Sequence, residues 1–343
     1  MSEPKISLMS AEQNLRIPFV KMSGAGNDFV IFDGRKAEIN LSPTQIKKIS
    51  DRKNIGCDQL IILQASFEKG GGLARKSEDG GFVSKLDHSL NHPSAANAAP
   101  SLFLLTENSL LLSELQLPKA IVKEGLPDCI MEIYNSDGSL SGACGNATRC
   151  VASILLSEKE SNSVKIQTAA GILDCWREGD LISVNMGVPN FDWQKIPLAH
   201  QTDSQKIPLF NFEFACVNVG NPHAVTFINQ ALNDADFFAI GPQVETNPLF
   251  PQKTNVEFVR ILSDDLMEVR VWERGSGETL ACGSGACAVA ILAIRKNLTK
   301  SKKITTRFKG GDLTIEWNGD GSPVIMTGGY QKIFDGVLDG SFL

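Results

Sequence analysis

Two cysteines in this sequence share one local pattern, and a thiol in such a position can act as an acid or a base. Cys144 lies in LSGACGNATRCVA, and Cys282 lies in GETLACGSGACAVA. Each is followed by glycine and small polar residues, and then by apolar residues three and four positions apart, the spacing of a buried helix face. The pattern predicts that each cysteine immediately precedes a helix.

A helix N-terminus favours both an anion and a thiolate. Its first N–H groups lack partners within the helix, and its dipole is positive at that end. A cysteine there can have its pKa lowered from about 8.5 to roughly 3.5–7.5. A cysteine before a helix is more often a small core residue, so both interpretations stay open for Cys144 and Cys282. Cys150 and Cys287, inside the helices, are expected to be packing residues.

Two facing thiols could invert a stereocentre. One thiolate would remove a proton from a carbon beside a carboxylate, while the opposite thiol delivers a proton to the other face. The helix-end amides would stabilise the developing negative charge. The sequence has no phosphate-binding glycine loop, no CxxC pair and only four histidines. We therefore expect neither a cofactor nor a metal.

The chain contains an internal repeat. Asn135 precedes Cys144 by nine positions, and Glu273 precedes Cys282 by nine. Further upstream, SGAGNDFVIFD at 23–33 is similar to VGNPHAVTFI at 219–228. Two similar α/β halves predict a pseudo-twofold arrangement with a cleft between them, where small-molecule sites preferentially lie.

The spacing also predicts an insertion in the first half. Gln59 and Asn135 are 76 positions apart, whereas Asn255 and Glu273 are 18 apart. The extra residues, about 58, lie between about 66 and 127 and are rich in glycine, serine and alanine. This composition is typical of a flexible loop or a disordered segment, and we assign it no chemistry.

Composition excludes several classes of protein. The 343 residues carry a net charge of −6 and no run of Lys and Arg, which argues against nucleic-acid binding. No stretch reaches the ~20 apolar residues that span a bilayer, and the N-terminus lacks the apolar core of a signal peptide. We expect a cytoplasmic protein whose eight cysteines are reduced.

These motifs, taken together and in order, resemble the diaminopimelate epimerase family over about residues 17–343, apart from the insertion. The resemblance implies interconversion of LL- and meso-diaminopimelate, in lysine and peptidoglycan precursor biosynthesis, without pyridoxal phosphate. It implies an α/β (α+β) fold of two pseudo-twofold-related domains, each a curved, mainly antiparallel sheet around a central helix, with the active site in the cleft. The domains would be 17–185, with the tail 329–343 packing back on it, and 186–328. The motifs are FVKMSGAGNDFVIFD, DRKNIGCDQL, YNSDGSLSGACGNATRC, VNVGNPHAV, TNVEFV and VWERGSGETLACGSGACA.

The resemblance also implies residue roles. Cys144 matches the proton donor and Cys282 the acceptor, and these labels exchange with the direction of reaction. His223 and Glu273 would tune the thiols. The expected partner is a small amino-acid substrate, in a homodimer that binds neither nucleic acid nor membrane. The residues that match substrate-contacting positions are Asn27, Gln59, Asn135, Gly145, Asn146, Asn221, Asn255, Glu273, Arg274, Gly283 and Ser284.

Other functions remain open at this stage. Proline racemases and hydroxyproline epimerases also use two cysteines, but their second motif usually follows Asp-Arg-Ser-Pro, whereas this chain has Glu-Arg-Gly-Ser. A phenazine-type isomerase would be expected to lack one or both thiols. A two-lobed amino-acid binding protein would bind a ligand without exchanging its hydrogen. A redox sensor would use the two thiols to form a disulfide.

Overall fold

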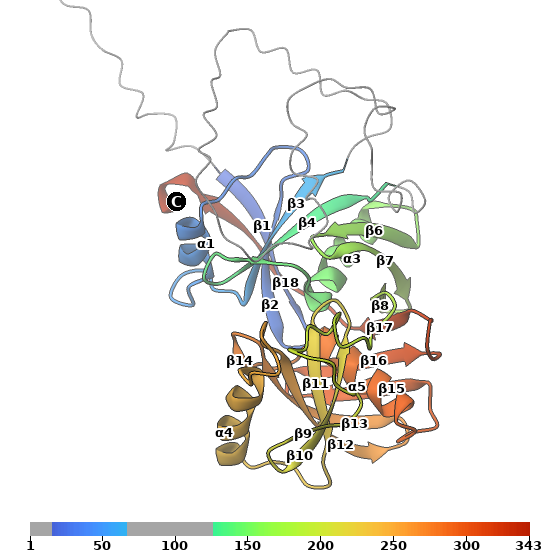
Figure 1. Ribbon diagram of the computed structural model, residues 1–343. Helices are drawn as coiled ribbons and strands as arrows, with labels where there is room; N and C mark the ends of the chain where they lie inside the picture. The colour runs from blue at the N-terminus through green and yellow to red at the C-terminus, as the bar shows by residue number, and fades with distance from the viewer. Residues whose placement is uncertain (1–15, 67–125) are drawn as a thin grey trace, which may run out of the picture. The chain divides into compact units, whose positions relative to one another are not determined.

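The computed structural model describes residues 16–66 and 126–343, which form a mixed α/β structure with a large sheet and few helices (Figure 1). The predicted insertion at about 66–127 lies, except for its ends, outside the described residues. Residues 16–65 and 127–343 belong to one compact unit. The elements up to residue 185 are β1 (Arg16–Gly24), β2 (Asn27–Asp33), α1 (Pro43–Ser50), β3 (Gln59–Ala65), β4 (Cys129–Asn135), β5 (Leu140–Ser141), α3 (Gly145–Glu158), β6 (Ser163–Thr168), β7 (Gly171–Glu178) and β8 (Leu181–Asn185).

The rest of the chain repeats this order of strands and helices. One short strand precedes the repeated set, and one long strand and a short 3₁₀ helix follow it. These elements are β9 (Ile207–Leu209), β10 (Phe212–Asn218), β11 (Pro222–Phe227), α4 (Asp234–Glu245), β12 (Asn255–Ser263), β13 (Leu266–Glu273), β14 (Gly277–Glu278), α5 (Gly283–Arg295), β15 (Lys303–Phe308), β16 (Gly311–Trp317), β17 (Val324–Gly328), β18 (Gln331–Asp339) and η4 (Gly340–Phe342).

Strand pairing follows the same pattern in both halves. β2 pairs in parallel with β3 and β4 with β6, as β11 does with β12 and β13 with β15. The other neighbours are antiparallel, and β8 joins β17 across the two halves. β18, which contains most of the C-terminal tail, lies antiparallel to β1 of the first half.

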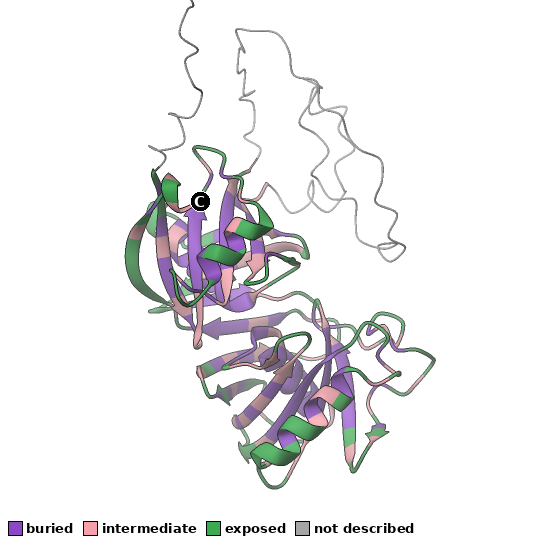
Figure 2. Cartoon of the chain, turned by 90° about the vertical axis from the view of Figure 1, so that its left-hand side faces the viewer, coloured by how far each residue is buried: buried purple, intermediate pink, exposed green. Residues whose placement is uncertain are grey.

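The helices α3 and α5 are buried, whereas α1 and α4 each keep an exposed face. Nearly every residue of α5 is buried, because the helix has small and apolar residues on all of its faces. Buried residues of both helices belong to one hydrophobic cluster with the strands around them, and Figure 2 shows that burial also runs along most strands. The predicted helices after Cys144 and Cys282 are therefore confirmed.

A tight hairpin positions the start of β2. Ala25 and Gly26 have φ values of 51° and 85°, and Asn27 follows as the first residue of the strand. A Cβ atom on Gly26 would lie only 2.7 Å from the Cα of Gly310, so a glycine is required there by space as well as by conformation.

Candidate active site

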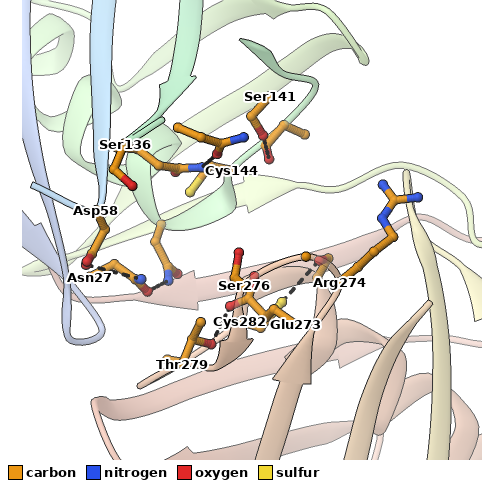
Figure 3. Close-up of a pocket in the computed structure, with 18 of the residues that line it drawn as sticks. Asn27, Asp58, Ser136, Ser141, Cys144, Glu273, Arg274, Ser276, Thr279 and Cys282 are labelled. Carbon is orange, nitrogen blue, oxygen red and sulfur yellow. Dashed lines mark hydrogen bonds between the residues drawn. The ribbon is translucent and has the colours of Figure 1, made fainter. Parts of the chain in front are cut away.

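One cavity of about 1550 Å³ is lined by residues of both halves. Figure 3 shows Cys144 and Cys282 entering it from different elements, with Glu273 and Arg274 near Cys282. His223, predicted to tune the thiols, does not line the cavity. The other predicted site residues all do: Asn27, Gln59, Asn135, Cys144, Gly145, Asn146, Asn221, Asn255, Glu273, Arg274, Cys282, Gly283 and Ser284.

Cys144 and Cys282 are each the N-cap of a helix. The Ala147 amide donates to Cys144 Sγ at 3.5 Å, and the Gly285 amide donates to Cys282 Sγ at 3.3 Å. Cys282 is 6% exposed and Cys144 is half-buried. The two helix starts lie close together, since a Cβ atom on Gly283 would be 3.6 Å from the Cα of Gly145.

The expectation of lowered thiol pKa values is wrong for this structure. Burial raises the pKa of Cys144 to about 11, although the Ala147 amide acts in the opposite direction. Burial, reinforced by Glu273 and Glu257, raises the pKa of Cys282 well above its usual value. Removing a thiolate from water therefore outweighs the helix-end amides. Burial therefore favours the protonated form of both thiols.

Side-chain amides of the first half form hydrogen bonds with one another at the cavity wall. Asn146 Nδ2 donates to Asn27 Oδ1 at 2.8 Å, which ties the start of α3 to the start of β2. Gln59 Nε2 donates to Asn135 Oδ1 at 3.1 Å across β3 and β4. Asn27 Nδ2 and Asn135 Nδ2 donate in turn to Asp58 and Ser139, so these side chains are held in place at the cavity wall.

The end of β13 and the turn that follows it place a carboxyl group, of Glu273, and a guanidinium group, of Arg274, at the cavity. Glu273 is half-buried and accepts a hydrogen bond from Thr279, and burial raises the pKa of its carboxyl group. The backbone N–H of Arg274 donates to Asn255 Oδ1 at 2.9 Å. The exposed Arg274 side chain donates to the Gln252 carbonyl at 3.2 Å. This end of the cavity can therefore accept an ammonium and a carboxylate.

The predicted residue His223 lies behind the cavity wall. Its side chain is fully buried, with Nε2 2.9 Å from Asn221 Oδ1 and Nδ1 2.7 Å from Glu257 Oε1. It therefore contacts a residue that lines the cavity without lining it itself.

Sequence reasoning missed three charged residues: two are buried near the thiols, and one lines the cavity. Glu257 is fully buried against His223, and Arg149 is fully buried inside α3. Asp58 lines the cavity and receives hydrogen bonds from the Asp28 amide and from Arg52. The available signal was a charge within an apolar run, as in TNVEFV and NATRCVA, because such charges are rarely buried without a reason.

No group of three or more His, Cys, Asp and Glu side chains that could hold a metal ion occurs within residues 16–66 and 126–343. In the same two ranges, no helix has the length and apolar character needed to cross a membrane.

The fold recurs among solved structures of low sequence identity. A hydroxyproline epimerase from Agrobacterium vitis matches with a TM-score of 0.56 at 11% identity, covering 94% of this chain and 92% of that chain. A phenazine biosynthesis protein of the PhzF family from Bacillus anthracis also matches with a TM-score of 0.56 at 11% identity, covering 94% and 99%. This chain therefore shares its fold with an epimerase and with a protein of the PhzF family.

Sequence comparison assigns the family. The family model described as diaminopimelate epimerase matches residues 120–191 and 215–333. The diaminopimelate epimerase of Gluconobacter oxydans (strain 621H) is 37% identical, over 94% of this chain and 99% of that protein. The one from Rhodospirillum centenum (strain ATCC 51521 / SW) is 36% identical, over 95% and 93%. The chain belongs to the diaminopimelate epimerase family and is an isomerase of that family.

Proposed function

We propose that this protein interconverts LL- and meso-2,6-diaminopimelate, in lysine and peptidoglycan precursor biosynthesis. The observation that carries the proposal is that two cysteines, each the N-cap of a helix in a different half, line one cavity. The relatives at about 36% identity are named diaminopimelate epimerases, and this chain matches them over nearly their whole length, which supports the same substrate.

The reaction is a proton transfer at the α carbon between two sulfur atoms. Cys282, as thiolate, takes the α proton, and the electron pair left on carbon is shared with the substrate carboxylate. The Cys144 thiol then gives its proton to the opposite face, so the stereocentre is inverted and the charge on the thiol pair moves to Cys144. The reverse reaction uses the same two groups in exchanged roles.

Helix-end amides stabilise the anionic form of the substrate. The first turns of α3 and α5, at Gly145, Asn146, Gly283 and Ser284, supply N–H groups to the carboxylate beside the reacting carbon. The substrate brings an ammonium group to the same carbon. A cation there favours a thiolate, which offsets the burial that keeps both thiols protonated.

The far end of the substrate is the second recognition element. Diaminopimelate carries a second ammonium and carboxylate, and Glu273, Arg274 and the amides of Asn135, Asn221 and Asn255 are the groups suited to them. Proline has no such second end, and these polar groups would then remain unpaired in the cavity.

We also propose that the fold consists of two pseudo-twofold-related domains, each a curved, mainly antiparallel sheet around a central helix. The repeated strand pairing and the burial of α3 and α5 support this division. The domains are 17–185 with the tail 329–343, and 186–328, and the active site lies between them.

Deuterium incorporation tests the function. The reduced protein is incubated with LL-diaminopimelate in deuterated water, and we expect deuterium at one α carbon together with formation of the meso isomer. Cys144→Ala and Cys282→Ala should each abolish inversion. Cys175→Ala is the matched control, because Cys175 is buried in β7 and does not line the cavity.

Two results would overturn the proposal. Inversion of L-proline but not of diaminopimelate would reassign the substrate. Binding of diaminopimelate with no deuterium gain would indicate a binding protein rather than an enzyme.

A further inference from the structure

The two thiols hold equivalent positions in the repeat but lie in unequal surroundings. Phe29 is opposite Gln59 in the first half, and His223 is opposite Asn255 in the second. The same registers pair Ile31 with Ile61 and Val225 with Glu257. The first half therefore has an apolar Phe29–Ile61 pair where the second has the buried His223–Glu257 pair.

The helices α3 and α5 also differ in charge, and here the charged residue is in the first half. The fifth residue after Cys144 is Arg149, whereas the fifth after Cys282 is Cys287. Arg149 is fully buried. Its Nη1 donates to the Gly145 carbonyl at 3.4 Å, and its Nε donates to the Gly329 carbonyl at 3.3 Å. A cation therefore lies at the start of α3 with no equivalent in α5.

The charge on Arg149 is not neutralised by an acidic side chain among residues 16–66 and 126–343. No carboxylate there forms an ion pair with it, and its Nη2 atom has no hydrogen-bond partner in the same part of the chain. Burial lowers the pKa of Arg149, but a guanidinium group stays charged in proteins. In a medium of low dielectric such a charge acts over several ångströms.

The charges that act on Cys282 have the opposite sign, and they belong to Glu273 and Glu257. A Cβ atom on Gly285 would lie 2.8 Å from Glu257 Oε1 and 3.4 Å from Cys282 Sγ. The carboxylate and the sulfur are therefore no farther apart than the sum of these distances. Glu273 raises the pKa of both thiols, and Glu257, bonded to His223, raises that of Cys282 in addition, whereas Arg149 lowers that of Cys144.

We propose that Arg149 is a positioning residue that makes the two thiols unequal, so that the first proton to leave the substrate-free pair comes from Cys144 rather than from Cys282. The inference rests on the proposed function for its significance, because only a two-thiol proton transfer depends on which sulfur is charged. The isomer whose α hydrogen faces Cys144 meets the base directly. The other isomer requires the remaining proton to move from Cys282 to Cys144 first.

The test is the pH dependence of alkylation at each cysteine. The reduced, substrate-free protein is mixed rapidly from neutral pH into iodoacetamide at each of a series of higher pH values and quenched before it unfolds. Mass spectrometry of peptides then gives the rate at each site. The thiolate attacks carbon and iodide leaves, so the rate follows ionisation. The midpoint is the pH at which the alkylation rate of a cysteine reaches half of its maximum, and it does not depend on how accessible the sulfur is. We expect a lower midpoint for Cys144, and an equal or reversed order would overturn the proposal.

Charge variants test the cause. Arg149→Met removes the charge while keeping an unbranched side chain, and Arg149→Lys retains the charge. We expect Arg149→Met to raise the Cys144 midpoint by about one pH unit, the order that Coulomb's law gives for unit charges roughly 10 Å apart at an effective dielectric of about 20. At a fixed pH the Cys144 rate should fall about threefold, because the higher nucleophilicity of a less acidic thiol recovers part of the loss. Arg149→Lys should retain most of the Cys144 rate of the protein without substitutions.

A structural role would give a different pattern. Loosening of the core would speed alkylation at the fully buried Cys216, and a shift of both midpoints by the same amount in Arg149→Met would overturn the proposal. If that variant does not fold, the order of the two midpoints in the protein without substitutions still decides whether Cys144 ionises before Cys282. An enzyme with the reverse order would still exchange deuterium, so failure here is distinguishable from failure of the proposed function.

Discussion

His223 Nδ1 lies 2.7 Å from a carboxylate oxygen of Glu257, and the two side chains, from the neighbouring strands β11 and β12, are fully buried. The other ring nitrogen lies 2.9 Å from Asn221 Oδ1, so the imidazole is held on both sides. Neither His223 nor Glu257 lines the cavity, whereas Asn221 does. The pair therefore meets the cavity wall through Asn221 without lining the cavity itself.

Removing one member of this pair should be costly. Glu257→Ala leaves a buried imidazole without its partner and should lower the free energy of unfolding by about 3–5 kcal/mol. Glu257→Gln keeps a hydrogen-bonding side chain and should cost less, about 1–2 kcal/mol. Urea unfolding of both variants measures the difference, and equal losses would contradict the role of the hydrogen bond.

The first half supplies a matched control for the same pair. The double variant with His223→Phe and Glu257→Ile copies Phe29 and Ile61, which occupy the corresponding positions. Replacing a buried polar pair by apolar residues is often neutral for stability. We expect unfolding close to that of the unmodified protein but a kcat at least about tenfold lower. Full activity in the double variant would show that the pair has only a structural role.

Gly285 is required because Glu257 occupies the space beside it. A Cβ atom at Gly285 would lie 2.8 Å from Glu257 Oε1 and 3.2 Å from Cys282 Cβ. Gly285→Ala should cost about 1–3 kcal/mol through overpacking. It should also lower kcat by up to about 100-fold, because a shift of about 1 Å in a reacting group can have that effect. Gly142→Ala is the control for stability, since nothing lies within 4 Å of its Cβ position.

The repeat made the positions that line the cavity predictable, because residues at matching distances before each cysteine reach the same cavity. Glu257 and Arg149 could not be placed in this way. Their significance depends on strands and helices that are distant in sequence: Glu257 meets His223 and Gly285, and Arg149 meets the carbonyl of Gly329. The thiol pKa was mispredicted for a related reason. A helix start is visible in a sequence, whereas the depth at which it is buried is a property of the packed halves.

An ion-pair cluster beside the cavity should make stability depend on pH in acid. Burial alone would raise the pKa of Asp28, but hydrogen bonds from Arg52 and Lys21 hold it at about 2, below its ordinary 3.8. The stabilisation is therefore present above pH 3.8 and is lost as the pH falls through about 2.

Arg52→Met should remove part of this stabilisation. The guanidinium side chain is 60% exposed, so solvent screening limits the loss at neutral pH to below about 1 kcal/mol. The difference in urea midpoint between the variant and the unmodified protein should close as the pH approaches about 2. High salt should also narrow it at neutral pH. A gap that is independent of both pH and salt would indicate lost packing instead.

Buried thiols should make stability fall in alkali. Burial raises the pKa of Cys129, Cys150 and Cys287 to about 12 from an ordinary 9.0. Below pH 9 a thiol keeps its proton in both states, so it adds no pH dependence. Above that pH the unfolded chain releases the proton while the folded protein retains it up to about pH 12. The unfolded state then binds fewer protons, and the free energy of unfolding falls by about 1.4 kcal/mol per pH unit for each such thiol.

Cys129→Ala isolates one of these contributions. Cys129 lies in β4, is fully buried and does not line the cavity, so its removal leaves the catalytic thiols in place. The cavity left by the missing sulfur lowers stability equally at every pH, whereas the lost titration changes only the slope. We expect the slope of unfolding free energy between about pH 9 and pH 10 to become shallower by about 1 kcal/mol per pH unit, because the unfolded thiol is only half ionised at pH 9. Parallel curves for the variant and the unmodified protein would show that the folded state does not hold this proton.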